Sequence, residues 1–517
     1  MQQNNSLSSI DQLLRLLLLS LATILTVAFV YVSFKRMLFP YEIRWMEGGM
    51  LDHVLHIRAG GQLYDQPGWE FTPLIYMPLY HYLSAAVSFI TGENFISMRL
   101  VSVVSTYAAA ILAAKIVLKE TESQFSALIS GLFFIAAFKI SGYYLDLGRV
   151  DSLFVALLLG YYYCARNMPG KGGQILAAVI ATLAFFTKQA TVLYATPIVL
   201  YLFLTQPKSI RFITPLTGIL LTLGGLAYMH LSTQGWFWYY VFELPLAHNY
   251  QWHLLPSVLK NALLLQIPFL LATAALAAVF ANSNERRQSV FTLLIFFTVT
   301  GATLLHYMHT GSAANVLLPL HASGALLLGY SLAILEKKRL LATAGLLLTT
   351  AQFGMLAYWP NNILPKDAQI ERNRLTEECY AQIPGPILST RIGYVSHKLG
   401  IKPTATEPAI ADVFRTEDNE TNTALMNEFR ERVDAQYYDA AFLGIQMHVA
   451  LKDILEENYV YAGTNFDRKG SGGGYQLSSV WLSKNFIGDR VLVDIPVCEA
   501  DSIFVESIDP TAVYTRR

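Results

Sequence analysis

Over roughly the first 360 residues, long apolar runs alternate with short polar stretches. Most of these runs approach the length of about 20 residues that a helix needs to cross the hydrocarbon core of a bilayer. The pattern predicts an α-helical polytopic membrane protein with about eleven spans. The predicted spans are approximately 13–34, 99–117, 124–141, 151–165, 173–188, 190–206, 212–230, 257–280, 289–305, 316–335 and 340–358.

One further apolar stretch, from Leu74 to Ile90, is not expected to cross the membrane. It is short, follows Pro73, and contains Pro78 and His81. These features favour a helix that lies in the membrane interface or dips into it. If this stretch crossed, every later loop would change side.

Positive charge in the loops orients the spans, because basic loops stay in the cytoplasm. With Arg15 and the N-terminus inside, alternation places every later short basic loop on the same side, whereas Lys35 and Arg36 fall outside and count against the scheme. No small-residue cleavage site precedes Phe34, so the first span is expected to remain. The predicted location is a bacterial-type inner (plasma) membrane, with the C-terminal region extracytoplasmic. The basic loops are Lys115/Lys119, Arg166/Lys171, Lys208/Arg211, Arg286/Arg287 and Lys337/Lys338/Arg339.

Composition supports a membrane domain followed by a soluble one. Of the 517 residues, 54% are hydrophobic and only 14% are charged, whereas soluble domains carry about 25% charged residues. The net charge is zero, so nothing points to nucleic acid. Charged residues are enriched from about Asn362 onward. We therefore divide the chain into a transmembrane domain, 1–361, with a first outer loop at 35–98, and a soluble extracytoplasmic domain, 362–517.

The soluble domain is predicted to have an α/β fold. Short apolar runs at 387–389 and 440–443 are typical of buried strands, and 421–433 and 449–457 have helical periodicity. The glycine-rich turn 469–474 lacks the Lys-Ser/Thr ending of a phosphate loop, and a strand-like run, 475–482, follows it. Cys379 and Cys498 could form a disulfide bond in an oxidising compartment, and two free thiols explain them equally well.

This topology brings unusual polar residues to one side of the membrane. Charges near the hydrocarbon core are costly unless they are paired, solvated or required for function, so their convergence indicates a functional site. Carboxylates there can act as a general base or hold a divalent cation, and Lys or Arg can neutralise a lipid phosphate. The candidates are Glu42, Arg44, Glu47, Tyr64, Tyr80, Asp146, Arg149, Asp151, Lys188, His248 and Asn315.

Each candidate also has a structural interpretation. Glu47 and Arg44 could pair with each other, and Asp151 suits the N-cap of a helix. Lys188 could anchor its segment by extending to the interface. His248 is more simply a structural or surface residue, and the aromatic residues of 236–240 suit an interfacial belt.

Several short motifs resemble those of a known superfamily. The segment from Tyr41 to Glu47 resembles the first-loop Asp-Glu-x-Arg-Tyr-x-Glu signature of the lipid A aminoarabinose transferases. These belong to the GT-C superfamily, with the protein O-mannosyltransferases and bacterial family-39-like enzymes. Further similar segments are Glu47-Gly48, Gly61 to Tyr64, Pro78-Leu79-Tyr80, Asp151 at the opening of the fourth span, Thr187-Lys188-Gln189 and Asn315 to Pro319, so that the resemblance covers roughly 10–335.

The resemblance implies a GT-C transmembrane catalytic domain that transfers a sugar, with inversion, from a polyprenyl-phosphate donor to a lipid, glycan or protein acceptor. Glu47 would be the general base, and Asp151 would orient the acceptor or support the site. Donor phosphate would be held by Lys188, Arg149 and Arg44. The remaining candidates would contact substrate: Glu42, Asp146, Tyr64, Tyr80, His248 and Asn315.

The chain departs from the family pattern in three places: Tyr41 replaces an Asp, Tyr76-Met77 replaces a Glu-Lys pair, and Gln189 replaces a Gly. Loss of the Glu-Lys pair removes a metal ligand, so dependence on a divalent cation stays open. The alternative function is a transporter or flippase of lipid-linked saccharides. It predicts polar residues through the membrane depth and often inverted repeats, and we find no such repeat.

Overall fold

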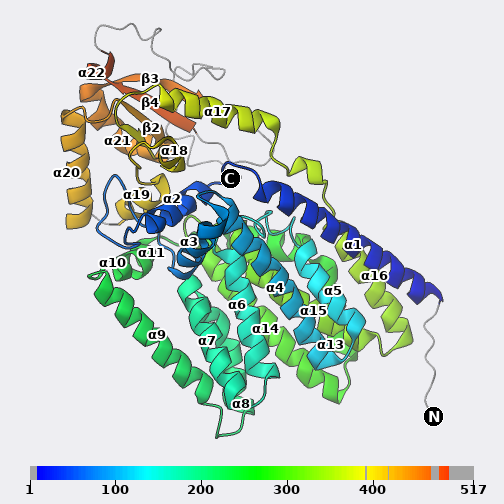
Figure 1. Cartoon of the computed structure of the whole chain (residues 1–517). Helices are drawn as coiled ribbons and strands as arrows, with labels where there is room; N and C mark the ends of the chain where they lie inside the picture. The colour runs from blue at the N-terminus through cyan, green and yellow to red at the C-terminus, as the bar shows by residue number, and fades with distance from the viewer. Residues whose placement is uncertain (1–8, 391–392, 417–418, 467–476, 488–517) are drawn as a thin grey trace, which may run out of the picture.

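The structure is a computed structural model that describes residues 9–390, 393–416, 419–466 and 477–487. It has a helical part and a C-terminal α/β part (Figure 1). The glycine-rich turn 469–474, Cys498 and the side chain of Cys379 lie outside what is described, so the disulfide bond stays a prediction. Cys164 is a buried free thiol.

The helical part contains a helix at each of the predicted spans, because each apolar run can satisfy its backbone only as a helix. Five helices are long and apolar enough to cross a membrane, or up to seven if two bent pairs count as one span each. The count of about eleven stays a prediction. The helices are α1 (Ser9–Met37), α4 (Ile96–Thr121), α5 (Gln124–Ala136), α6 (Asp151–Asn167), α7 (Lys171–Thr187), α8 (Thr191–Thr205), α9 (Ile213–Ser232), α13 (Pro268–Phe280), α14 (Ser283–Tyr307), α15 (Leu318–Leu335) and α16 (Arg339–Met355).

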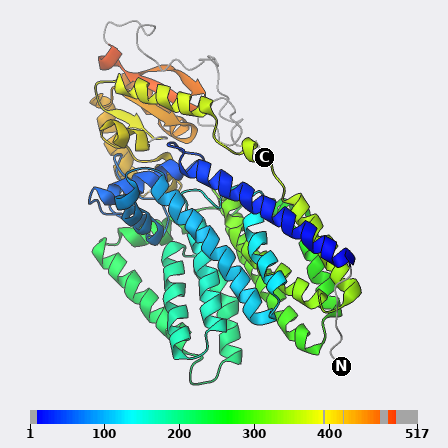
Figure 2. The ribbon, with the colours of Figure 1, turned by 45° about the vertical axis from the view of Figure 1, so that its right-hand side comes forward.

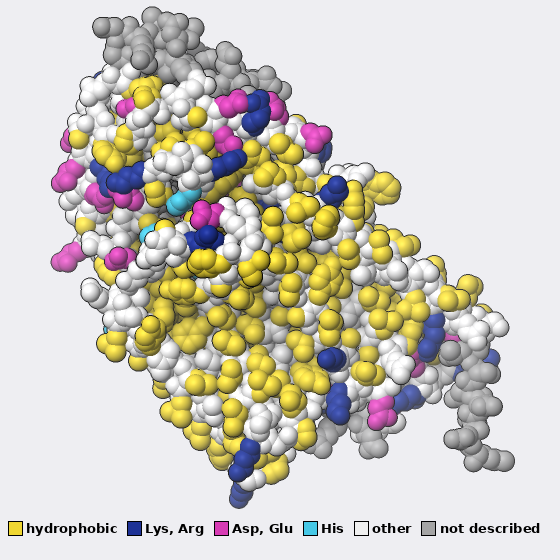
Figure 3. All heavy atoms as spheres, viewed as in Figure 1, with side chains coloured by type: hydrophobic (Ala, Val, Ile, Leu, Met, Phe, Trp, Pro, Cys, Tyr) yellow, Lys and Arg dark blue, Asp and Glu magenta, His cyan; other side chains and the backbone are white. Residues whose placement is uncertain are grey.

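The surface of the helical part is apolar over a broad belt, with charges gathered on the C-terminal part and at the opposite end (Figure 3). Large hydrophobic side chains such as Leu216, Leu220 and Leu223 are exposed along α9. In contrast, every residue of α15 is buried, so this helix forms the centre of the bundle. An apolar outer surface around a packed interior is what a lipid environment requires.

Short helices cover the end of the bundle that faces the C-terminal part, here called the domain-facing end (Figures 1 and 2). The stretch predicted to lie at the interface forms the 13-residue α3, which is too short to cross a bilayer. The short helices at this end are α2 (Glu47–Arg58), α3 (Leu79–Thr91), α10 (Trp236–Trp238), α11 (Leu244–Ala247) and α12 (Leu255–Val258).

The C-terminal part contains a four-stranded sheet in the order β1-β2-β4-β3. The strands β1 and β2 are parallel, with Ile387 opposite Ala440, and the other two pairings are antiparallel. The predicted strands 387–389 and 440–443 fall within β1 and β2, and the predicted helices fall within α20 and α21. The predicted strand 475–482 overlaps β4, which begins at Leu477, and its first two residues lie outside the described part of the chain. Its elements are α17 (Asp367–Ala381), β1 (Ile387–Ser389), α18 (Gly393–Leu399), α19 (Glu407–Phe414), α20 (Glu420–Asp434), β2 (Ala440–Gly444), α21 (Ile445–Asn458), β3 (Tyr459–Phe466), β4 (Leu477–Ser483) and α22 (Lys484–Ile487).

The first loop joins the two parts. The indole nitrogen of Trp69 donates to the carbonyl oxygen of Leu425 at 2.8 Å, and the amide of Ala405 donates to the carbonyl oxygen of Trp69 at 2.9 Å. Trp69 is fully buried and packs against Phe429 of α20. Burial of a side chain of this size anchors the C-terminal part on the domain-facing end.

Candidate functional site

Glu47 begins α2 and is completely buried. Its Oε1 accepts from Arg99 Nε and from the Gly148 amide, both at 2.8 Å, and its Oε2 accepts from Arg99 Nη2 at 2.7 Å and the Ile43 amide at 3.0 Å. Burial opposes ionisation, but Arg99 and these donors together lower the pKa of Glu47. A carboxylate held in this way is a weak proton acceptor, so the structure argues against its predicted role as general base.

Arg99, which the sequence did not single out, is the partner that fixes Glu47. The remaining donors of its buried guanidinium go to the carbonyl oxygens of Arg36, Phe39 and Tyr41. All five N–H groups of the side chain are therefore used. This arrangement, which we call the Glu47 hub, ties the start of the first loop to α4 and to the loop before α6.

Asp146 has a structural partner of its own. It pairs with Arg36 at 3.1 Å, and both side chains are 1% exposed. Burial raises the pKa of Asp146 to about 6, although Arg36 opposes the shift. The pair explains how Arg36 can lie at the end predicted to be outside, because its charge is neutralised within the protein. Neither oxygen of Asp146 has a hydrogen-bond partner among the described residues, and its contact with substrate stays a prediction.

A second group of charges gathers around Asp151, the first residue of α6. Its Oδ1 accepts from Lys188 Nζ at 2.9 Å and its Oδ2 accepts from Asn315 Nδ2 at 2.9 Å, while Arg149 Nε lies 3.5 Å from Oδ2. All four residues are at most 7% exposed. Candidate residues predicted from the sequence, which lie at three separate helix ends, thus come together in the structure.

Tyr76 from the first loop extends this group. Arg149 Nη2 donates to the Tyr76 hydroxyl at 2.8 Å, and the guanidinium also lies 5.7 Å from the ring centre of Tyr144. The guanidinium of Arg44 lies 5.7 Å from the same ring and donates to the carbonyl oxygen of Gly142. Two of the predicted phosphate-binding cations therefore lie against one aromatic ring.

The C-terminal part contributes Asp412 of α19, a residue that the sequence reasoning missed. Its Oδ1 accepts from Arg415 at 2.5 Å and lies 3.5 Å from Nε2 of His248. Burial raises the pKa of Asp412 to about 7, against the opposing effect of Arg415. Tyr76 is within electrostatic reach of both Asp151 and Asp412. Among the described residues, nothing hydrogen bonds to the other oxygen of Asp412.

His248 is neutral beside Asp412, because burial lowers the pKa of its ring to about 4. Its ring centre lies 5.0 Å from that of His309. The ring of His306 is within electrostatic reach of Lys188 and Asp151. Seven residues now define what we call the polar cluster: Tyr76, Arg149, Asp151, Lys188, His248, Asn315 and Asp412.

An apolar cavity lies among the helices directly below the polar cluster. It is bounded by α6, α8, α14 and α15. Tyr194, in the first turn of α8 and six residues after Lys188, lies in its wall. The Tyr194 hydroxyl is 3.2 Å from that of Thr303, so its polar atom is satisfied. Further lining residues include Val155, Leu158, Pro197, Val299, Pro319 and Leu326.

Three other candidates lie away from the polar cluster. Tyr64 and Tyr80 are buried, and their hydroxyls donate to the carbonyl oxygens of Tyr76 and Met98, so that their contacts with substrate stay a prediction. Glu42 is half-buried and lies within electrostatic reach of Tyr394 of α18. It therefore belongs to the interface between the first loop and the C-terminal part.

A bound divalent cation does not fit the described residues. Among them, no three His, Cys, Asp or Glu side chains come together in a way that could hold a metal ion. Asp151 accepts hydrogen bonds from Lys188 and Asn315 and forms an ion pair with Arg149, and this leaves it a poor metal ligand.

Comparison with known proteins finds similarity in part of the sequence and in the fold. Residues 72–230 match the model of the dolichyl-phosphate-mannose-protein mannosyltransferase family. The crystal structure of ArnT from Cupriavidus metallidurans bound to undecaprenyl phosphate is similar with a TM-score of 0.55 at 9% identity, over 88% of this chain and 97% of that one. The chain has the fold of a GT-C membrane glycosyltransferase. Its resemblance to this superfamily, predicted from the sequence, is confirmed.

The other structures to which the chain is similar also share little sequence identity with it. The apo structure of the same ArnT gives a TM-score of 0.54 at 10% identity, over 88% of this chain and 97% of that one. The oligosaccharyltransferase AglB from Archaeoglobus fulgidus gives 0.45 at 11% identity, over 89% and 74%. No curated protein matches the sequence. The segment that matches the family model contains Tyr76, Arg149, Asp151 and Lys188, but neither Glu47 nor Asp412.

Proposed function

We propose that this protein transfers a sugar, with inversion, from a polyprenyl-phosphate-linked donor to a lipid, glycan or protein acceptor at the outer face of a membrane. The observation that carries the proposal is the position of the polar cluster, at the domain-facing end, directly above an apolar cavity. A lipid-linked donor has the same two parts, a charged phosphate and a long apolar chain.

Lys188 and Arg149 are the proposed ligands of the donor phosphate. Lys188 uses one of its three donors on Asp151, and Arg149 presents a fork of N–H groups, so both retain donors for an anion. Their pairing with Asp151 holds them in place before the donor arrives. The polyprenyl chain would lie along the cavity between α6, α8, α14 and α15, and the structure of the similarly folded ArnT bound to undecaprenyl phosphate supports this placement.

Asp412 is the proposed general base, in place of Glu47. It is the one carboxylate of the polar cluster with an oxygen that no described residue occupies, and its pKa of about 7 suits proton transfer near neutral pH. The acceptor hydroxyl would give its proton to Asp412, and its oxygen would form a bond to the anomeric carbon. The bond from that carbon to the phosphate oxygen breaks, and its electron pair leaves with polyprenyl phosphate, held by Lys188 and Arg149.

Replacement of Lys188 tests the donor site. In proteoliposomes, Lys188→Met should lower transfer of a radiolabelled sugar from a polyprenyl-phosphate donor by about 100- to 1,000-fold, because one preorganised donor to the leaving phosphate is lost. Lys452→Met, on α21 of the C-terminal part, is the matched control and should retain full transfer. Equal rates for the two variants would overturn the assignment. Flipping of labelled lipid without transfer would instead support the transporter function.

A further inference from the structure

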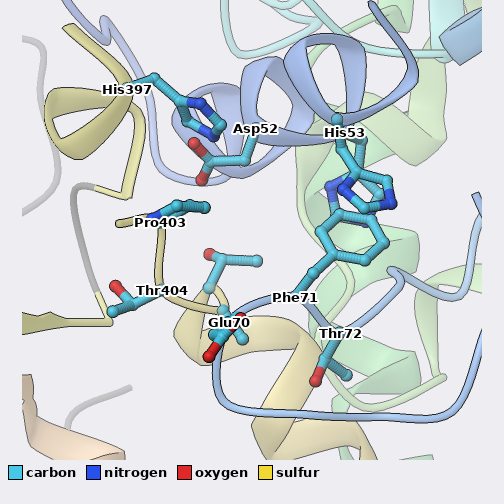
Figure 4. A pocket seen from close by; sticks show the side chains of 11 residues that line it. Asp52, His53, Glu70, Phe71, Thr72, His397, Pro403 and Thr404 are labelled. Atoms are coloured by element: carbon cyan, nitrogen blue, oxygen red, sulfur yellow. The ribbon is translucent and has the colours of Figure 1, made fainter. Parts of the chain in front are cut away.

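A small recess lies between α2 of the first loop and the C-terminal part (Figure 4). It has a volume of about 20 Å³, which is enough for one group the size of a water molecule. Figure 4 shows the side chains around it: Asp52 and His53 extend from α2, Phe71 and Thr72 belong to the first loop, and His397, Pro403 and Thr404 belong to the C-terminal part. The recess lies outside the polar cluster and shares no residue with it.

Asp52 is the feature of this recess that needs an explanation. Its side chain is 7% exposed, and neither of its carboxylate oxygens has a hydrogen-bond partner among the residues that the structure describes. Burial and the nearby Glu42 raise the pKa of Asp52 well above its usual range. A buried carboxylate without a donor is costly, so a group that supplies one would bind with a gain in free energy.

The two histidines of α2 do not donate to Asp52. His397 lies beside Asp52 in Figure 4, and no hydrogen bond joins the two side chains. His53 Nδ1 lies 2.7 Å from the carbonyl oxygen of Gly49, and its Nε2 accepts from the Leu74 amide at 2.8 Å, so both ring nitrogens are used. Because one nitrogen must accept, the His53 ring is neutral. His56 Nε2 lies 3.0 Å from the carbonyl oxygen of Gln62. Within the described part of the chain, the lining of the recess contains no lysine or arginine.

An open pocket of about 270 Å³ adjoins the recess and shares His56, Glu70 and Phe71 with it. The rings of His56 and Phe71 stack at 3.7 Å and form the wall between the two spaces. The open pocket also contains Asp65, Glu428 and Arg432. Arg432 is already paired with Glu70 and Glu428, and Lys402 with Glu70. Apart from Asp52, the three carboxylates of Asp65, Glu70 and Glu428 therefore face the two cations Arg432 and Lys402, and the site carries excess negative charge.

We propose that the recess and the open pocket together bind an acceptor through a protonated primary amine, whose N–H groups donate to Asp52. An ammonium group fits because it is small, donates three hydrogen bonds and brings the positive charge that the site lacks. An ammonium group would stabilise the ionised form of Asp52, which burial disfavours in the empty recess, whereas a hydroxyl of the same size brings no charge that does so. An amino sugar and a lysine side chain both offer this group.

The link to transfer rests on the proposed function. Thr406 lines the recess and immediately precedes α19, and Asp412 lies six residues further on. At 1.5 Å per residue, this is about 9 Å along the helix. An acceptor of that length held by its amine at Asp52 could place a hydroxyl near the proposed base.

Binding of matched amines tests the site without transfer. The full-length protein in nanodiscs would be titrated with glucosamine against N-acetylglucosamine, and with Nα-acetyl-lysine amide against its Nε-acetylated form. Within at least one pair, the free amine should bind about tenfold or more tightly than its acetylated partner, because acetylation removes the charge. The pair with the larger preference identifies the source of the amine. Equal affinities within both pairs, as expected for a recess that holds only water, would overturn the proposal.

Asp52→Asn should abolish the preference for the free amine, whereas Asp453→Asn, an 86% exposed control on α21, should retain it. Asn is nearly isosteric and removes an unpaired buried charge, so we expect this variant to fold. Glu428→Gln, in the open pocket, should lower the preference partially and provides a second variant. An unchanged preference in Asp52→Asn would overturn the site. Lys188→Met should lose transfer but keep amine binding. A failure of the proposed amine site can therefore be distinguished from a failure of the proposed transferase function.

Discussion

Two buried groups of charges lie at the domain-facing end, and they differ in what they leave unused. In the Glu47 hub, both oxygens of Glu47 and all five N–H groups of Arg99 are bonded within the protein. In the polar cluster, Lys188 keeps two donors and Asp412 keeps one oxygen. A saturated group stabilises the fold, whereas an unsaturated one can meet a substrate. The comparison teaches that a costly charge marks a site only when its bonding capacity is incomplete.

The largest expected effect is on Asp412. Asp412→Asn keeps the size of the side chain but removes the proposed base, so transfer should fall by about 100- to 10,000-fold. Initial rates with a radiolabelled polyprenyl-phosphate donor would be compared with those of Asp453→Asn. Donor binding should be unchanged, because Lys188 and Arg149 are intact. Transfer within about threefold of the control would remove Asp412 from the chemistry.

Glu47→Gln should act on stability instead. The variant leaves Arg99 buried without a carboxylate, and breaking a buried ion pair costs about 3–5 kcal/mol. Thermal unfolding in detergent should therefore occur at a markedly lower temperature, while transfer per folded molecule stays within about tenfold. Normal stability together with a 100-fold loss of transfer would reverse the comparison and return the role of base to Glu47.

The smallest effect is the dependence of transfer on pH. Asp412 must be deprotonated to accept a proton, and burial raises its pKa to about 7. The rate should therefore rise with pH, about tenfold per unit below pH 7, and level off above it. The lowered pKa of Glu47 predicts no such step near neutrality. A flat profile between pH 6 and 8 in the wild-type protein would contradict the assignment of Asp412.

Several members of the polar cluster were predictable from the sequence. Asp151, Lys188 and Asn315 each lie at a helix end, and alternation of apolar runs sends those ends to one side of the membrane. The same reasoning identified Glu47 as a candidate site residue, but the sequence did not predict its structural role. Arg44 lies three residues away and suggested the pair, whereas the actual partner, Arg99, is 52 residues further along the chain.

Asp412 was the hardest member to predict. The available signal was an acidic residue within the apolar run from Ala409 to Phe414, which is typical of a buried carboxylate. Nothing in the sequence tells which surface this run packs against. The contact with His248 depends on how the C-terminal part rests on the first loop.

By itself, the sequence determined the helical segments and the end at which their polar residues gather, because both follow from the length and order of apolar runs. The tertiary structure alone decided which charge pairs with which. Ion pairs and hydrogen bonds depend on distances of about 3 Å between side chains far apart in the chain, and only packing sets those distances. Packing therefore made Glu47 a structural residue and Asp412 the candidate for catalysis.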